Sequence, residues 1–402
     1  MPEYRLHATP GTILWGRLPH AGTKPALSVP SGATVIAHTV SHEGMVEDQG
    51  RDPAAYFTGL GIEKADILAD AAAIAGSGIE HDFNHDGPHI LNGPVAVETA
   101  APGDVLKVET LALAPRVRYG VISNRHGKGA LAGEFPENDG NVSLLSRIEK
   151  RNGRWVGVLP AGEKELTFPL HFFIGTIGVA PGVSESWNSV PPVHTGGNID
   201  IKELGVGSTL YLPVEAEGAL FFLGDPHFAM GDGEVALSAL EGSLDVALRL
   251  TVLKKGSPEI PASGDEDAFA LFGETERYWI VPGLHPDLDE AVKIATRRAV
   301  RFLSTQFGLA RAAALAYLSA ATDFHISQVV DRTKGVHALI RKTDFTDFLR
   351  FSIETGGMEI PLVPVDGELR YSLSDQGLVV NWSTCGTQMK GTATPARFFP
   401  EL

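Results

Sequence analysis

The 402-residue sequence contains little cysteine, few basic residues and no long apolar run. Its single cysteine, Cys385, excludes an intrachain disulfide and a thiolate metal cluster. No segment approaches the roughly 20 apolar residues of a transmembrane helix, and the first residues lack the apolar core of a signal peptide, so we expect a cytoplasmic protein. Thirty-three basic residues against 49 acidic ones give a net charge of -16, which argues against nucleic-acid and membrane partners.

Three common hydrolase signatures are also missing. There is no G-x-S-x-G elbow and no G-x-x-x-x-G-K-[ST] loop, and Cys385 has no histidine close to it in the sequence. Serine-triad, phosphate-loop and thiol hydrolases are therefore disfavoured. What the sequence offers instead is a set of polar residues in glycine-rich segments beside apolar ones.

The first part of the chain has the pattern of short strands. Forty-five glycines and 26 prolines are spread evenly, which predicts many tight turns. Residues 31–38, 102–109 and 206–212 each begin with a turn and continue as a strand, with alternation of apolar and polar residues. We predict a sandwich-like or barrel-like body, interrupted by a helical excursion within residues 52–76.

The last third has a different pattern. Asp287 and Glu290 form a capping box that predicts a helix ending at Gly308, with a second, alanine-rich helix over 309–321. Strands are expected over 326–330 and 336–340. The apolar spacing predicts the buried face of the first helix at Ala291, Val292, Ala295, Ala299, Phe302 and Leu303.

Strands first and a helical pair late predict an α+β fold that is mainly β, with a β-sandwich-like body and a smaller α+β portion. A chain of this length exceeds the size of one core, which predicts more than one domain. We expect a β-rich body over residues 1–262 that holds most site residues, and an α+β portion with the helical pair over 263–345. Residues 346–402 are expected to form a C-terminal extension that packs on the body. An acidic turn at 264–267 marks the first boundary.

The densest group of ionisable residues lies in residues 224–234, after an apolar run that predicts a buried strand. The segment holds Asp225, His227, Asp232 and Glu234 among three glycines and a proline, so we predict a turn rather than a helix. Burial of four such groups is unfavourable unless they pair or bind a cation. The segment therefore predicts a metal site or a general-base site, and a solvated acidic turn is the alternative.

Two histidines elsewhere are candidate ligands. His42 follows the first predicted strand in a Ser-His-Glu-Gly segment, as a ligand or as part of a solvated turn. His89 is the last of three histidines spaced by four residues, and it leads into a strand. It is the best ligand candidate of the three, although the whole segment could be a surface loop.

Two further segments carry donors and carboxylates. Lys128 lies in a basic, glycine-containing loop that could polarise a carbonyl, while Arg125 in the same loop could form a structural salt bridge. Asn198 and Asp200 follow His194 and a pair of glycines. If this stretch is extended, the two side chains point to the same face.

Several motifs together resemble the acetamidase/formamidase family. They run in family order over roughly residues 10 to 345, and the last fifty or so residues lie outside the resemblance. Residues 41–44 and 124–129 resemble the acetamidase branch. The matching segments are Asn92-Gly93-Pro94-Val95, Ala101-Pro102-Gly103-Asp104-Val105, Gly175 to Pro181, Gly196 to Lys202, Gly224-Asp225-Pro226-His227, Gly231-Asp232-Gly233-Glu234, Asp287 to Ala291, and Ile326 to Asp331.

The resemblance implies hydrolysis of a small aliphatic amide, acetamide-like or formamide-like, to a carboxylate and ammonia. It also implies a homo-oligomer, a dimer or larger. A γ-lactam hydrolase is one alternative, because members of this kind have been linked to lactam opening. A non-catalytic β-sandwich protein that binds a small ligand is the other alternative.

Since the sequence offers no clear nucleophile, water held by a divalent metal is the simplest route to amide hydrolysis. We expect zinc rather than calcium, because the candidates include imidazoles. The expected metal ligands are His42, His89, Asp200, Asp225 and His227.

The remaining polar residues are assigned to catalysis and substrate binding. Glu234 would take the proton of the water and pass it to the departing nitrogen, with Asp232 and Lys128 as further catalytic residues. Asn198 and His194 would bind the substrate. Without a metal, Glu234 acting directly on water is the better account.

Overall fold

The computed structural model describes residues 3–265 and 268–349 and, further on, the segments 351–355, 358–362, 369–374, 377–384 and 387–393. The chain divides into two units, residues 1–340 and 341–402. The boundary predicted near residue 262 falls inside the first unit, because strands before and after it share one sheet. The predicted packing of residues 346–402 on the body stays a prediction.

The second unit is small. It begins with the 3-10 helix η3 (Lys342–Leu349). Its strands form two antiparallel sheets: β23 (Phe351–Thr355) with β24 (Met358–Leu362), and β25 (Leu369–Ser374), β26 (Gly377–Thr384) and β27 (Thr387–Ala393).

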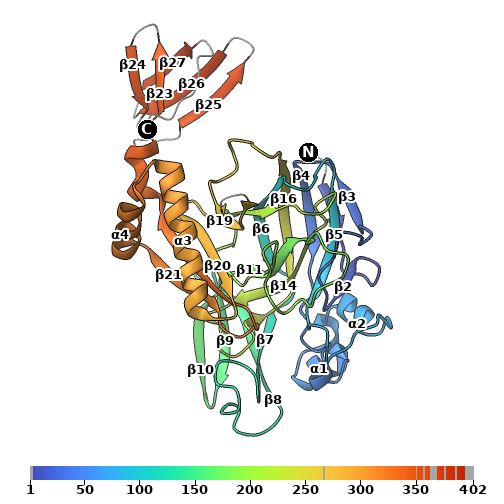
Figure 1. The fold of residues 1–402 in the computed structure, drawn as a ribbon. Coiled ribbons are helices and arrows are strands. Elements are labelled where there is room, and N and C mark those ends of the chain that lie inside the picture. Colours follow the sequence, from blue (N-terminus) through green and yellow to red (C-terminus); the bar gives the residue numbers. More distant parts are fainter. Residues whose placement is uncertain are drawn as a thin grey trace. The chain divides into compact units, whose positions relative to one another are not determined.

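A nine-stranded sheet forms one layer of the first unit (Figure 1). The three predicted turn-and-strand segments all become strands of this sheet, and β4 alternates buried with half-buried residues as expected. The order of the strands is β1 (Glu3–Leu6), β4 (Ala33–His38), β16 (Leu244–Leu253), β6 (Val105–Pro115), β13 (Thr209–Pro213), β19 (Phe272–Glu274), β20 (Tyr278–His285), β22 (Lys334–Arg341) and β21 (Asp323–Gln328).

An eleven-stranded sheet forms the second layer. Three of its strands lie off the main path, where β5 (Ile90–Val97) pairs with β14, β2 (Ile13–Trp15) and β3 (Leu27–Val29). The main path is β10 (Lys164–Pro169), β9 (Arg154–Ala161), β8 (Asn141–Arg151), β7 (Tyr119–Arg125), β15 (Leu240–Glu241), β14 (Phe221–Ala229), β11 (Phe173–Val179) and β12 (Gly196–Asn198). A two-stranded ladder, β17 (Gly264–Asp265) with β18 (Ala268–Phe269), stands apart from both sheets.

One apolar core joins the two sheets. Val35, Leu106 and Leu248 of the first sheet and Ile177 and Phe221 of the second belong to the same buried cluster. Two sheets that share a core in this way form a sandwich-like body. The predicted α+β, mainly β class is therefore confirmed.

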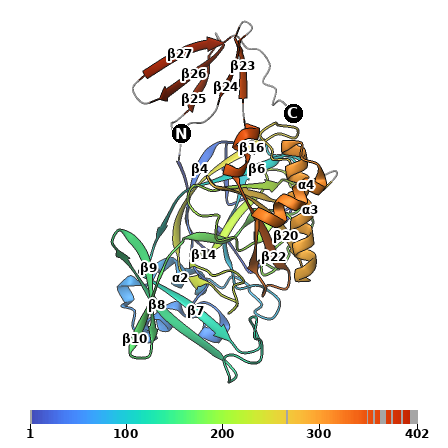
Figure 2. The same ribbon diagram turned by 90° about the vertical axis from the view of Figure 1, so that its left-hand side faces the viewer.

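Four helices accompany the sheets. The predicted excursion contains α1 (Pro53–Gly59), the short 3-10 helix η2 (Lys64–Asp66) and α2 (Ala69–Ala75), and another 3-10 helix, η1 (Glu47–Gln49), precedes it. The predicted helical pair is α3 (Leu288–Phe307) and α4 (Arg311–Ala321), which lie side by side next to β20 (Figures 1 and 2). Among the described residues, no helix is long and apolar enough to cross a membrane.

The helix α3 begins and ends where the sequence predicts. Asp287 accepts a hydrogen bond from the Glu290 backbone N–H, and Gly308 ends the helix in the left-handed region at φ 67°. The second half of the capping box is absent, because the Glu290 carboxylate pairs with Lys293 instead. The predicted buried face is confirmed except at Val292, which is 38% exposed.

The segment 224–234 differs most from its prediction. The strand β14 runs from Phe221 to Ala229, so Asp225 and His227 lie inside a strand at the centre of the second sheet, not in a turn. The chain turns later, around Asp232 and Gly233. Pro226 is tolerated because Asp225 adopts φ 55°, which interrupts the regular ladder at this point.

Candidate active site

Three predicted metal ligands, Asp200, Asp225 and His227, lie close together above Gly175. The partner strands β11 and β14 pair Ile174 with Pro226 and Thr176 with Gly224, so Gly175 lies opposite Asp225. The Gly175 carbonyl accepts hydrogen bonds from the backbone N–H groups of residues 199 and 200. A Cβ at Gly175 would stand 2.6 Å from Asp200 Oδ1 and 2.7 Å from Asp225 Oδ2. A glycine is therefore required at this position, because the space above it belongs to the carboxylates.

The other two predicted ligands come from loops. His42 follows β4, and its Nδ1 lies 3.7 Å from Asp225 Oδ1. His89 precedes β5, and its Nε2 lies 3.8 Å from Asp225 Oδ2. The Nδ1 of His89 is paired with Ser189 Oγ at 2.8 Å, which orients the ring so that Nε2 faces the cluster. Both imidazoles are buried.

Three further carboxylates complete the surroundings. Glu241 on β15 has Oε1 3.3 Å from His227 Nε2. Glu234 lies in the loop after β14 and lines the pocket described below. Asp331 accepts a hydrogen bond of 3.0 Å from Asn198 Nδ2. All three are buried, so the site concentrates negative charge inside the protein.

The cluster offers two adjacent groups of ligand atoms. One group is His42, Asp225 and Glu241, and the other is Asp200, His227 and Glu234; within each group, one ligand atom per residue lies within 4.8 Å of the others. The groups touch where His227 Nε2 lies 3.1 Å from Asp225 Oδ2.

Many of these buried atoms are unsatisfied. Seven make no hydrogen bond of acceptable geometry: His42 Nδ1, Asp200 Oδ1 and Oδ2, Asp225 Oδ1, His227 Nδ1 and Nε2, and Glu241 Oε2. Each such buried polar atom costs about 1–3 kcal/mol of folding free energy when it has no partner. This concentration of unpaired acceptors and imidazole nitrogens fits a divalent cation.

The histidines respond to burial in two ways. Burial lowers the pKa of His42 to about 3 and also lowers the pKa of His89, so both imidazoles are neutral, the form that binds metals. Burial likewise disfavours protonation of His227, but Glu241 and Asp225 outweigh it and raise the pKa of His227 well above its usual range. In the absence of a cation, a protonated His227 is thus the main positive charge facing these carboxylates.

The carboxylates repel one another. Burial, aided by the charge of neighbouring carboxylates and opposed by His227, raises the pKa of Asp200, Glu234 and Asp331 well above the usual range. Burial acts in the same direction on Asp225, but His227 leads the charges that reverse it, so the pKa of Asp225 is lowered. A divalent cation would let all of these groups ionise together.

The backbone is also unusual at this site. Asp200, Asp225 and Glu234 have φ values of 49°, 55° and 46°, the left-handed region that residues other than glycine seldom adopt. Such conformations store roughly 1–3 kcal/mol each and concentrate at functional sites. They also explain why Asn198 and Asp200 do not form the extended pair expected from the sequence.

Asn198, a predicted substrate-binding residue, is fully hydrogen-bonded within the protein. Its Nδ2 donates to Val190 O at 3.1 Å and to Asp331 Oδ2, while its Oδ1 accepts from Thr176 Oγ1 at 2.7 Å. Both amide hydrogens are used within the protein. Asn198 therefore holds Asp331 in place, and its predicted role in substrate binding stays a prediction.

A pocket of about 690 Å³ opens onto the cluster. His42, His89, Asp225, Glu234 and Glu241 line its inner part. A basic loop, which includes Lys128, lines its outer part. Arg125 in that loop is paired with Asp48 at 2.6 Å, which agrees with the structural alternative for this arginine. The catalytic role of Lys128 stays a prediction.

Two predicted site residues lie elsewhere. His194 is half exposed and pairs with Glu215 at 2.7 Å, outside the pocket. Asp232 pairs with His325 at 2.7 Å and with Lys202. These positions argue against the substrate-binding role of His194 and the catalytic role of Asp232, because neither side chain lines the pocket that opens onto the cluster.

Three residues near the cluster are not among the predicted site residues. Glu241 lies in a two-residue strand with no motif around it. Glu43 stands beside His42, and it accepts hydrogen bonds from Gln49 and Ser123 and faces Arg125 at 3.8 Å. Asp331 ends a segment that matches the family, which could have drawn attention to it.

The fold and the cluster define a mainly β protein with a buried histidine–carboxylate centre at the base of a pocket. Residues 183–347 match the model of the Acetamidase/Formamidase family. A formamidase of Methylophilus methylotrophus is 26% identical over 318 residues, which cover 65% of this chain and 77% of that protein. An acetamidase of Mycolicibacterium smegmatis is 26% identical over 221 residues, and the match spans 42% of this chain and about half, 54%, of that relative.

Two solved structures have the same fold. A predicted acetamidase/formamidase from Thermoanaerobacter tengcongensis superposes with a TM-score of 0.65 at 27% identity, covering 86% of this chain and 97% of that one. An acetamidase from Bacillus halodurans superposes with a TM-score of 0.65 at 28% identity, covering 85% of this chain and 99% of that one. Over residues 183–347 the chain is similar to the acetamidase/formamidase family. Its assignment to the acetamidase branch stays a prediction, because relatives with both names match at equal identity.

Proposed function

We propose that this protein hydrolyses a small linear amide to a carboxylate and ammonia, with a divalent cation held by the cluster over Gly175. The observation that supports this most strongly is the set of seven unsatisfied atoms on five buried residues. The family supports the substrate class, since relatives are named formamidase and acetamidase. Amide hydrolysis by water needs an activated water and a protonated leaving nitrogen, and the cluster offers groups for both.

The cation would be held by residues from both ligand groups. Asp200, Asp225 and His227 stand at the centre, with His42 and Glu241 on one side. His89 is near enough to join through Nε2. Three imidazoles among the candidates favour zinc over calcium, which prefers oxygen ligands. A bound divalent cation would supply Lewis acidity, which lowers the pKa of water and polarises a carbonyl.

The remaining steps belong to the chain's own residues. Glu234 is buried beside Asp200 and His227 yet lines the pocket, so its carboxylate can accept a proton from water and return it to the departing nitrogen. Asn198 holds Asp331 in place beside this path. Lys128, on the outer part of the pocket, would attract the substrate or release the carboxylate product.

A substrate panel tests the proposal. The purified chain would be assayed for ammonia released from formamide, acetamide, propionamide and butyramide, because the pocket has room for more than the smallest amide. Ring-opened product from a γ-lactam would be measured separately, since a lactam keeps its nitrogen. We expect ammonia from at least one linear amide. Binding of amides without any product would favour a ligand-binding protein, and product from the lactam alone would contradict the linear-amide assignment.

A further inference from the structure

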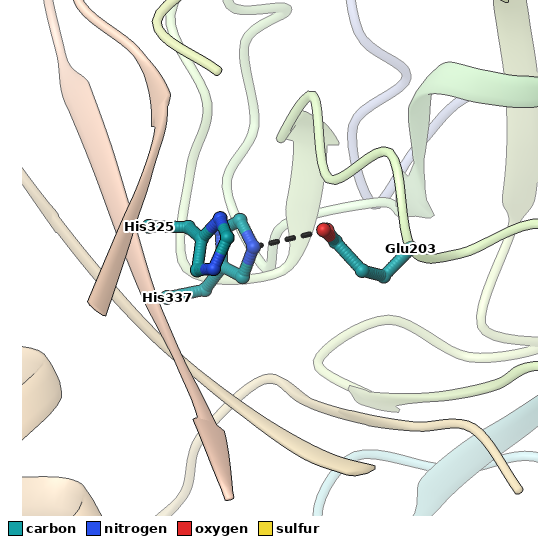
Figure 3. Close-up of side chains that lie close together, drawn as sticks. All are labelled: Glu203, His325 and His337. Carbon is teal, nitrogen blue, oxygen red and sulfur yellow. Dashed lines mark hydrogen bonds and ion pairs between the residues drawn. The ribbon is translucent and has the colours of Figure 1, made fainter. Parts of the chain in front are cut away.

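Two histidines on the hairpin of β21 and β22 and a carboxylate from another loop form a second group (Figure 3). His325 and His337 are directly opposite in the antiparallel ladder, and their rings are stacked with centroids 5.6 Å apart at 23°. Glu203, from the loop after β12, reaches His337 Nε2 with its Oε2 at 3.0 Å. One ligand atom from each of the three residues lies within 4.8 Å of the others.

The far side of each imidazole is held by another residue. Asp232 Oδ2 pairs with His325 Nδ1 at 2.7 Å, and Ser327 Oγ pairs with His337 Nδ1 at 2.7 Å. Protein metal sites have this arrangement, because a second partner on one ring nitrogen fixes the tautomer and turns the other nitrogen to the ion. With Nδ1 occupied in both rings, each histidine presents Nε2 as its metal-binding atom.

We propose that Glu203, His325 and His337 bind a second divalent transition-metal ion, of the zinc class, separate from the cation of the active site. Two imidazoles and one carboxylate are a ligand set that zinc accepts, with water in the fourth position. Ligand atoms around tetrahedral zinc are about 3.4 Å apart, so the longest separation here would shorten by up to about 1.4 Å. His325 and Glu203 are partly exposed and can make that movement, whereas His337 is buried and fixed.

The site would connect segments that carry the active site. Glu203 follows Asp200 by three residues, and Asp232 precedes Glu234 by two. The Gly233 N–H donates to Ile326 O, and the Val329 N–H donates to Gly233 O, so the loop with Glu234 already lies along β21. A metal at Glu203, His325 and His337 would fix both segments to the hairpin. It would position active-site residues and would not touch the substrate.

The chain offers a matched control for this pair. His7 and His38 are also stacked, at 4.6 Å and 12°, and His38 Nδ1 also pairs with a carboxylate, Asp245 at 2.6 Å. They do not belong to any three-ligand group found among the described residues. A change at His7 therefore removes a stacked histidine without removing a proposed ligand.

The test measures metal binding rather than turnover. The full chain, stripped by a chelator, would be titrated with Zn2+ against a chromophoric competitor, as wild type, His325→Gln and His7→Gln. We expect His325→Gln to bind one equivalent fewer than wild type, and His7→Gln to bind the same number. Asp232→Asn, which removes the charge of the outer partner of His325 and also changes the pair with Lys202, should weaken that equivalent about 10–100-fold.

Each outcome is decisive. Equal stoichiometry and affinity in His325→Gln and wild type would overturn the second site. If circular dichroism shows that His325→Gln does not fold, the same Zn2+ titration of Glu203→Gln replaces it, and the same outcomes apply. The result is independent of the proposed function, because an absence of amidase activity in every variant would reject that function and leave the count of zinc equivalents unaffected.

Discussion

The two histidine–carboxylate clusters differ in how their polar atoms are paired. Around Gly175, Asp200 has neither carboxylate oxygen in a hydrogen bond, and His227 has neither ring nitrogen in one. On the β21–β22 hairpin, both nitrogens of His337 have partners at 2.7 and 3.0 Å. The first cluster is only partly compensated, by His227, whereas the second is already hydrogen-bonded within the protein. We therefore expect a cation to be essential for the first and supportive for the second.

The largest expected effect comes from filling the space over Gly175. In Gly175→Ala, the new methyl group would stand less than 3 Å from Asp200, Asp225 and His227, so it would exclude a cation and push the ligands apart. We expect amidase activity to fall at least about 1,000-fold, a loss of roughly 4 kcal/mol of transition-state stabilisation, with the active-site metal lost in elemental analysis. Gly11→Ala is the control, because nothing lies within 4 Å of its Cβ position. Retained activity in Gly175→Ala would mean that the space above Gly175 does not hold a cation needed for catalysis.

The next effect concerns the base. Glu234→Gln keeps the shape of the side chain but cannot accept the proton of water. We expect kcat to fall about 100-fold to 10,000-fold while the metal content stays unchanged. Near-normal turnover would show that Glu234 is not the base. Glu47→Gln, a change at an exposed residue of the same pocket, should have little effect.

The next prediction concerns the free energy of unfolding, which should reflect the unpaired polar atoms around Gly175. In metal-free protein, Asp200→Asn removes one of several mutually repelling buried carboxylates. We expect the free energy of unfolding at pH 7 to rise by about 1–3 kcal/mol, measured by urea denaturation after chelation. With metal bound, we expect wild type to be more stable than Asp200→Asn, because the variant has lost a metal ligand. Lower stability of metal-free Asp200→Asn would contradict the idea of an uncompensated cluster.

A well-paired buried carboxylate should behave in the opposite way. Asp104 accepts hydrogen bonds from the Ala101 and Lys255 backbone N–H groups and from Lys254 Nζ at 2.8 Å. Burial raises the pKa of Asp104, but these donors, led by Lys254, outweigh it, and the net shift is downward. The stabilisation is therefore present above the unfolded pKa of about 3.9 and is lost as the pH falls through the lower folded value.

The matching variant is Asp104→Asn. We expect it to lose about 2 kcal/mol at pH 7, with the difference from wild type shrinking below about pH 4. Urea denaturation at a series of pH values checks this. A difference that is constant with pH would show that the ionised form of Asp104 does not supply the stability.

The sequence predicted the fold class, the helical pair and all five metal-ligand candidates that the structure brings together. These rest on local signals: helix spacing, caps, and histidines or carboxylates beside apolar strands. The sequence could not show that Asp225 lies inside β14, because the left-handed conformation that lets Asp225 and Pro226 continue the strand is fixed by the pairing with β11. Glu241 was missed because only tertiary contact brings β15 beside β14.

The positions of Asp232 and His194 outside the main pocket have a similar origin. Asp232 is two residues from Glu234, and His194 is four from Asn198, so closeness in sequence suggested a shared site. The chain turns between the members of each pair, and ion pairs with Lys202 and Glu215 hold the two side chains away from the pocket. Proximity along an irregular segment does not predict a shared direction.

The central claim is that the cluster over Gly175 uses a divalent cation to hydrolyse an amide. A rescue titration tests it most directly: ammonia release from the best amide of the panel is followed while Zn2+ is added to chelator-stripped protein. The account predicts no activity without metal and a rise that saturates at stoichiometric zinc. Full activity in protein that elemental analysis shows to be free of metal would contradict it, and Glu234 acting directly on water would then be the better mechanism.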